Sequence, residues 1–122
     1  MGDYRCVQEQ LRLGGSEGSE VTCASVDVSG YEVVKFVPYV GVSGGTGIGG
    51  TLSYETAPID DERYYRPLGD CSLQEGLCTV SVFLADDGDG GFEQFVRWKV
   101  KFTEVANDVT FDLDMMGYAK KR

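Results

Sequence analysis

The feature that most constrains this fold is a pair of alternating stretches near the end of the chain. In residues 96–103, apolar side chains occupy the even positions and basic or polar side chains the odd ones. In residues 109–115, apolar side chains occupy the odd positions, and aspartates take two of the three even ones. A period of two is typical of a β-strand with one buried and one exposed face. Both stretches therefore predict half-buried strands.

A short polar connection around residues 107–108 separates the two stretches, which predicts a β-hairpin. In the register that this turn sets, Phe102 faces Leu113 on the core side. On the other side Lys101 faces Asp114, and a cross-strand pair of opposite charges stabilises a sheet by roughly 0.2–1 kcal/mol. The hairpin predicts an antiparallel β protein and does not by itself indicate a function.

The outer side of this predicted hairpin carries the main basic patch of an acidic chain. We expect Asp112 and Asp114 to neutralise part of it. The charge that remains is expected chiefly at Arg97 and Lys99. These two residues are therefore candidate contacts with an acidic partner or a neighbouring subunit.

The composition fits one all-β domain over residues 1–122. The hydrophobic fraction of 42% is enough for a core. About eight predicted strands alternate with turn clusters, and no stretch has a convincing helical pattern. We therefore predict an antiparallel β-sandwich or jelly roll, with a small barrel as a further arrangement.

Residues 31–42 are apolar at both odd and even positions. Such a strand is buried on both faces, or one face meets a partner subunit. Pro38 lacks a backbone donor, which favours a place at a sheet edge or a bulge. The sequence predicts an interface here, with Tyr31, Val33 and Phe36 as candidate contacts.

A second candidate interface follows an acidic turn that lies between Pro58 and Pro67. Tyrosine and arginine are enriched at protein interfaces. The competing interpretation is an ordinary strand with exposed arginines and half-buried tyrosines. The candidate residues are Arg63, Tyr64, Tyr65 and Arg66.

The four cysteines favour two local disulfides, Cys6–Cys23 and Cys71–Cys78. The other two connectivities stay open, and so does the alternative of free buried thiols. A zinc site is not expected, because the chain has no His and no Cys-x-x-Cys.

Residues 79–84 alternate as well, which predicts a strand with Val80, Val82 and Leu84 pointing inward. An aspartate- and glycine-rich segment follows this strand. Clustered carboxylates can bind Ca²⁺, and the candidates here are Asp86, Asp87 and Asp89. The EF-hand pattern is incomplete, so a polar turn is the preferred interpretation. We therefore predict no metal and no cofactor.

Several function classes are disfavoured by composition. The net charge of −9 disfavours direct nucleic-acid binding, and no apolar run approaches the ~20 residues of a membrane-spanning helix. The lack of histidine removes Ser-His-Asp and Cys-His catalysis. We predict that the protein is not an enzyme.

The order of strands in the second half of the chain resembles small β-sandwich virion proteins of tailed bacteriophages. The segments that carry the resemblance are residues 50–56, 64–69, 78–82, 95–102 and 109–115, followed by a basic tail. The resemblance implies a capsid decoration (cement) protein, or another head or tail accessory, assembled in the host cytoplasm. It also implies a homo-oligomer, with a trimer favoured, that binds the major capsid protein or another virion protein.

The main alternative is a carbohydrate- or cell-surface-binding β-sandwich, secreted or borne on a virion. Its candidate stacking residues are Trp98, Tyr54, Tyr64 and Tyr65. Trp98 shares its parity with Val96 and Val100, which predicts that it lies in the core. A secreted domain of unrelated function, held by disulfides, is the third reading.

Overall fold

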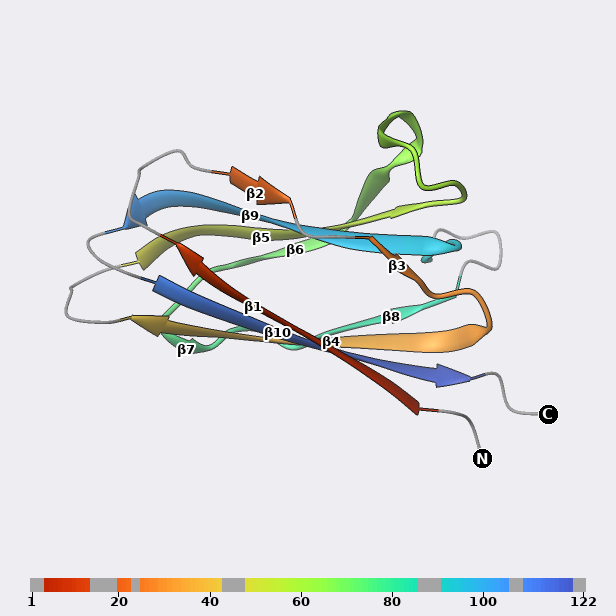
Figure 1. Ribbon diagram of the computed structural model, residues 1–122, viewed down its shortest axis with the longest axis horizontal. Helices are drawn as coiled ribbons and strands as arrows, with labels where there is room; N and C mark the ends of the chain where they lie inside the picture. The colour runs from red at the N-terminus through yellow and green to blue at the C-terminus, as the bar shows by residue number, and fades with distance from the viewer. Residues whose placement is uncertain are drawn as a thin grey trace.

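The computed structural model describes residues 4–13, 20–22, 25–42, 48–85, 91–105 and 109–119. Within these ranges the chain forms ten strands and one short 3-10 helix, η1 (Glu62–Tyr64). The strands form two antiparallel sheets that lie face to face (Figure 1). The predicted antiparallel β-sandwich is confirmed.

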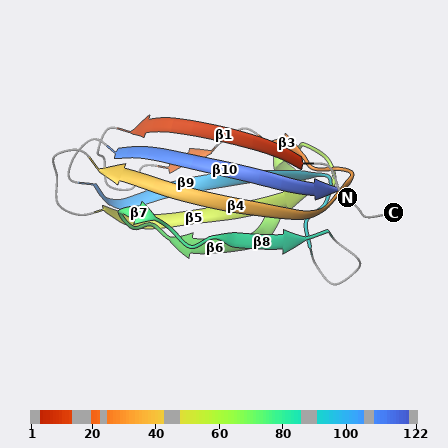
Figure 2. The ribbon, with the colours of Figure 1, turned by 90° about the horizontal axis from the view of Figure 1, so that it is seen from below.

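Sheet A is the lower layer in Figure 1 and the nearer layer in Figure 2. Its strands are, in order, β1 (Tyr4–Leu13), β10 (Val109–Ala119), β4 (Tyr31–Val42) and, along the far side of β4, β7 (Gly76–Leu77) and β8 (Ser81–Leu84). Sheet B contains β2 (Glu20–Thr22) and β3 (Val26–Asp27), both along β9 (Phe95–Val105), then β5 (Ile48–Ala57) and β6 (Arg66–Ser72).

The predicted hairpin is wrong, because β9 and β10 belong to opposite sheets. Val100 of β9 pairs with Val21 and Leu52 in sheet B, whereas Met115 of β10 pairs with Phe36 in sheet A. The turn residues 106–108 lie outside the described part of the chain. A link of three residues reaches roughly 13 Å when extended, which is enough to cross the ~10 Å between packed sheets. A short connection therefore does not distinguish a hairpin from a crossing between sheets.

The predicted inward faces of both strands are confirmed where side chains are described. Trp98 on β9 and Leu113 on β10 are fully buried, as are their neighbours of the same parity, Val96, Val100 and Met115. The alternation of polar and apolar residues thus identified which side chains enter the core. It did not identify which strands pair.

Four aromatic rings join the two sheets in the core. Phe36 of sheet A stacks on Tyr54 of sheet B, with 4.4 Å between ring centroids, and meets Trp98 edge-on at 5.9 Å. Phe83 completes the cluster, at 5.4 Å from Tyr54. Its ring lies against Gly69, where an added Cβ would come within 2.9 Å of the ring. Gly69 therefore makes the room that this contact needs.

The predicted edge position of Pro38 is wrong, because β4 is an inner strand between β10 and the β7–β8 pair. β7 pairs with β4 at Tyr39 and Val40, and β8 pairs with it at residues 33–36. Pro38 lies between these two stretches, and its carbonyl accepts a hydrogen bond from the Cys78 amide. In an antiparallel strand the N–H and C=O of a residue point to the same side. The missing donor therefore faces the break between β7 and β8 and costs no ladder bond to β10.

Candidate interaction surfaces

The outer face of sheet A carries large apolar side chains that are exposed to water. We call this surface the apolar face. It extends over β4, β7, β8 and the end of β10. Its exposed members, with their exposed fractions, are Leu84 (63%), Val82 (56%), Leu77 (54%), Tyr39 (50%), Tyr118 (40%) and Val80 (39%).

Strand register makes the apolar face continuous. Val33 on β4 pairs with Leu84 on one side and Tyr118 on the other, and Tyr39 pairs with Leu77. Lys35 lies among these residues and pairs with Val82. Side chains of this size expose ~150–200 Å² when free, so the six exposed members leave on the order of 500 Å² of apolar surface in water. That is near the upper end for the largest patch of a monomeric protein.

The second surface is the projecting loop, residues 58–65, which joins β5 to β6. Figure 1 shows it rising from sheet B on the side away from sheet A. Asp61 caps η1, because its Oδ1 accepts a hydrogen bond from the Arg63 amide at 3.0 Å. The Arg63 guanidinium also donates to both oxygens of Asp61, at 3.1 and 2.9 Å. These hydrogen bonds hold the pKa of Asp61 below its ordinary value.

Arg97 anchors the projecting loop to the outer face of sheet B. Its Nε donates to Glu55 Oε1 at 2.8 Å, its Nη1 donates to Glu62, and its guanidinium lies 3.7 Å from the centre of the Tyr65 ring. The hydrogen bond to Glu62 is the main reason that the pKa of Arg97 is raised, and it also lowers the pKa of Glu62. Lys99 Nζ lies 3.5 Å from Glu55 Oε1. We call these five residues the anchor network.

The anchor network corrects two predictions from the sequence. Arg97 is only 7% exposed and is paired with two carboxylates, so it is not a site of uncompensated positive charge. Its counter-ions are Glu55 and Glu62 rather than Asp112 and Asp114, because the strand that carries those aspartates lies in sheet A. A sequence pattern that repeats every two to four residues cannot identify Glu55 and Glu62 as partners of Arg97, because they lie 42 and 35 positions away in the chain.

The tip of the projecting loop presents Ile59 and Tyr64, which are 56% and 47% exposed. Tyr65 donates a hydrogen bond to Asp60 at 2.8 Å, and Arg66 donates one to the Gly91 carbonyl at 2.7 Å. The residues of the predicted Arg/Tyr cluster therefore do not form one exposed surface. Tyr64 faces water, whereas Tyr65 and Arg66 help to fix the loop. Ile59 was not predicted, although an apolar residue isolated between Pro58 and an acidic run was a signal.

The three residues predicted as interface contacts in the 31–42 segment lie in three different environments. Phe36 is fully buried in the core and is not available to a partner, which corrects its assignment to an interface. Tyr31 is half-buried at the end of the core, where its ring packs on Gly117. Val33 belongs to the apolar face. Of the proposed stacking residues, Tyr54 and Trp98 are fully buried and cannot stack on a sugar, which confirms the core position predicted for Trp98.

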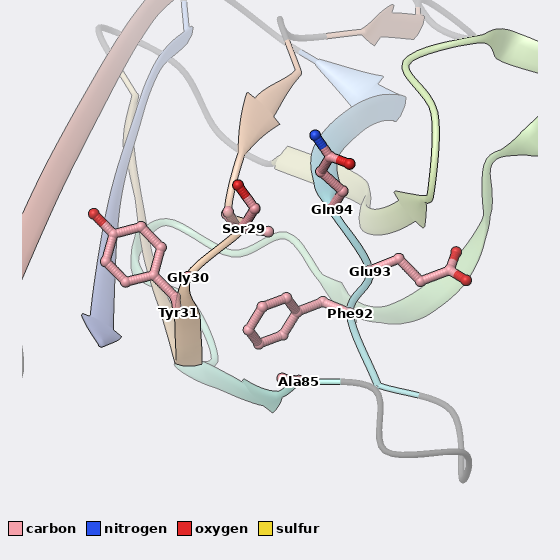
Figure 3. A pocket seen from close by; sticks show the side chains of 8 residues that line it. Ser29, Gly30, Tyr31, Ala85, Phe92, Glu93 and Gln94 are labelled. Atoms are coloured by element: carbon pink, nitrogen blue, oxygen red, sulfur yellow. The ribbon is translucent and has the colours of Figure 1, made fainter. Parts of the chain in front are cut away.

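An open hollow of about 600 Å³ lies at one end of the sandwich. Figure 3 shows the Tyr31 and Phe92 rings and the Glu93 side chain around it. Phe92 is 3% exposed and belongs to the core, and Glu93 pairs with Arg66 at 3.6 Å. We assign no function to the hollow.

Cys71 and Cys78 are both free thiols, so the predicted bridge between them is absent. The Cys78 thiol is directed back toward its own turn, 3.4 Å from the Gln74 carbonyl oxygen. Burial, followed by the nearby Cys78, raises the pKa of Cys71. The other predicted pair, Cys6–Cys23, falls outside the described residues, since Cys23 and the side chain of Cys6 are not described.

The candidate calcium ligands Asp86, Asp87 and Asp89 also lie outside the described ranges. Among the residues that the structure does describe, no three acidic or cysteine side chains are grouped so that they could hold a metal ion. No helix formed by these residues has the length and apolar character needed to span a lipid bilayer.

No protein-family model and no curated protein sequence matches the chain. One similar solved structure comes from Bacillus endospore appendages, described as disulfide-linked pili. It is 13% identical, with 98% of this chain and 93% of that chain covered, and its TM-score is 0.47. Another is the SPBc2 prophage-derived protein YomS, which is 9% identical, with 93% and 96% covered and a TM-score of 0.40. At these distances we transfer no function from either protein.

Proposed function

We propose that this chain is a structural, non-enzymatic virion protein, and specifically a capsid decoration protein. In this proposal it binds the particle surface as a homo-oligomer, with a trimer favoured, and contacts the major capsid protein or another virion protein. A secreted domain is the alternative location. The resemblance of the second half of the chain to phage virion proteins is the reason for placing it on a particle.

The observation that carries the proposal is the apolar face. Six large apolar side chains form one continuous patch that is exposed in the isolated domain, and patches of this size mark interaction sites. The net charge of −9 keeps such a domain soluble until it meets its partner. An exposed apolar sheet on an acidic domain suits a subunit that is completed by assembly.

The absence of catalysis is part of the proposal. The chain has no histidine, so a general base would have to be a carboxylate or another less common group. The acidic residues of the projecting loop are already engaged, since Asp61 pairs with Arg63 and Glu62 with Arg97. These contacts indicate that the carboxylates hold the loop in shape.

Density-gradient centrifugation of particles from the native source tests the proposed function. The wild-type protein should sediment with the particles, and purified particles should rebind the added protein. The variant Val82→Lys/Leu84→Lys should rebind at least tenfold more weakly. The control Thr51→Lys/Gln94→Lys adds the same charge at exposed positions outside the apolar face and should rebind as wild type does. Absence of the protein from washed particles would rule out the virion proposal.

A further inference from the structure

The outer face of sheet A is broad, and two long strands run through its middle. Figure 2 looks onto this face, where β10 and β4 lie side by side. Outward side chains alternate with inward ones along each strand, and the register determines which of them are neighbours. Only an occupant of similar breadth can cover the face and remove its exposed apolar surface, on the order of 500 Å², from water.

Two opposite charges stand on this outer face. Lys35 on β4 pairs in register with Met116 and Val82. Asp114 on β10 pairs with Val37, the next outward residue of β4. Lys35 and Asp114 are half-buried, and neither forms an ion pair with a described residue. An occupant of the face must therefore supply an anion for the lysine and a cation for the aspartate, because a charge buried without a partner is strongly destabilising.

We infer that the occupant is the same face of a second copy of this chain, related by a two-fold axis in the plane of the contact. The inference rests on the self-association in the proposed function, and it assigns a surface and a symmetry to it. Such a contact is isologous, since each copy contributes the same surface, and it closes with two copies. It therefore gives a dimer in solution, and the trimer favoured above would need a further contact through another surface.

The register makes the face complementary to itself in charge. We place the axis across the strands, at the level of the Phe36–Met115 pair, so that the two copies of β4 are antiparallel. Lys35 of one copy then faces Val37 of the other, whose neighbour on β10 is Asp114. Each lysine thus lies beside the aspartate of the other copy, and the two-fold axis produces this ion pair twice.

The same axis brings apolar side chains together at both ends of β4. Val33 of one copy faces Tyr39 of the other, because both lie three residues from Phe36. Leu84 and Leu77 are the respective neighbours of these two residues along the far side of β4, so they also face each other. A single arrangement therefore matches apolar groups with apolar groups and each charge with its opposite.

The buried area is that of a stable dimer. Two faces together remove on the order of 1,000 Å² of apolar surface from water. Homodimer interfaces are about 65% apolar, so their polar part brings the total to roughly 1,500 Å². That lies within the standard range for specific, stable interfaces. A copy of the face also has the breadth that covering the face requires.

Light scattering coupled to gel filtration tests the contact through the mass of the protein in solution. Wild type should be a dimer that dissociates on dilution. The face variant, Val82→Lys/Leu84→Lys, should be a monomer, because dimerisation would bury its added charges. The control Thr51→Lys/Gln94→Lys adds the same charge at exposed positions outside the apolar face and should remain a dimer.

An exchange of charges tests the assigned ion pair. Lys35→Asp alone and Asp114→Lys alone each bring like charges together at two points of the dimer. Each should therefore dimerise at least tenfold more weakly than wild type. An equimolar mixture of the two variants should dimerise with nearly wild-type affinity, because one copy then carries two aspartates and the other two lysines.

Three results would overturn the inference. Wild type that is a monomer at every concentration, or a trimer that the face variant abolishes, would rule out a two-fold contact through this face. A dimer that persists in the face variant would place the contact on another surface. Charge variants that do not recover on mixing would refute the assigned ion pair.

Circular dichroism confirms the fold of each variant. The neutral changes Lys35→Gln and Asp114→Asn replace a charge variant that does not fold, and each should weaken the dimer several-fold. A dimer that is unaffected by either neutral change would contradict the ion pair. None of these measurements uses particles, so a failure of the virion proposal and a failure of this inference can be told apart.

Discussion

The two outer faces of this sandwich differ in how far their outward side chains are paired within the chain. On sheet B, Arg97 and Lys99 point outward but are balanced by Glu55 and Glu62 of the same chain. On sheet A, the six exposed side chains of the apolar face keep 39–63% of their surface in water. The inner faces are alike, since both contribute buried apolar side chains to the shared core. One sheet is therefore complete in the monomer, and the other is incomplete.

This difference shows how a β-sandwich can divide stability from assembly. The anchor network contributes to folding, because its partners are brought together when the chain folds. The apolar face contributes less to folding than the core does, since 39–63% of each of its six exposed side chains stays in water in the folded chain. We therefore expect changes on sheet B to alter the stability of the monomer, and changes on sheet A to alter association.

The largest loss of stability should follow the removal of an aromatic ring that contacts both sheets. Phe36→Ala removes the stack on Tyr54 and the edge contact with Trp98, which should lower the free energy of unfolding by about 3–5 kcal/mol. Chemical denaturation measures it. The control is Val33→Ala, on the same strand but facing outward, with an expected loss below about 1 kcal/mol. Equal losses for both variants would refute the assigned inward and outward faces of β4.

A smaller loss should follow a break in the anchor network. Arg97→Met leaves Glu55 and Glu62 without their main counter-ion, and we expect a loss of about 2–4 kcal/mol. Hydrogen exchange should also become faster in the projecting loop. Lys99→Met is the matched control, because its ion-pair distances of 3.5 and 3.9 Å are longer, and it should lose less than about 1 kcal/mol. If Lys99→Met lowered the free energy of unfolding more than Arg97→Met, then Lys99 rather than Arg97 would be the residue that anchors the loop.

The apolar face should show the opposite behaviour. Val82→Lys/Leu84→Lys should change the free energy of unfolding of the monomer by no more than about 1 kcal/mol, because more than half of each side chain is already in water. Binding of an apolar fluorescent dye should fall several-fold. The control Thr51→Lys/Gln94→Lys should leave dye binding unchanged. A large loss of stability in the face variant would mean that these side chains are buried within the monomer.

The sequence predicted the fold class and the buried side of β9 and β10, because both follow from alternation within a few residues. It assigned the wrong side of β8, where Val82 and Leu84 are exposed and Phe83 packs against the core. It did not predict the sheet to which a strand belongs. A strand with one apolar face fits either layer of a sandwich, and the link between β9 and β10 is short enough for a hairpin and long enough for a crossing. The assignment depends on all strands packing together.

The candidate surfaces were predictable to different degrees. The two apolar faces of the 31–42 segment correctly indicated an unusual outer surface, and Val33 lies on it. The neutralisation of Arg97 could not be predicted, since Glu55 and Glu62 approach it only after the chain has folded. The tip residue Ile59 was missed because one isolated apolar residue has no period. Local patterns therefore identified strands, whereas long-range contacts decided which residues face a partner.

The smallest expected effect concerns pH. The hydrogen bond from Arg97 holds the pKa of Glu62 below its ordinary value of 4.5, so the folded chain binds this proton less readily than the unfolded chain does. The resulting stabilisation is present above pH 4.5 and is lost as the pH falls through the lowered pKa. Glu62→Gln should therefore melt slightly below wild type at pH 6, and the two curves should converge toward pH 3. Arg63 holds the pKa of Asp61 below its ordinary value of 3.8. The melting curves of Asp61→Asn and wild type should therefore converge at a lower pH than those of Glu62→Gln and wild type. A difference in melting temperature between Glu62→Gln and wild type that stays constant from pH 6 to pH 3 would show that Glu62 acts through packing. Glu55 would then be the only carboxylate whose charge stabilises the anchor network.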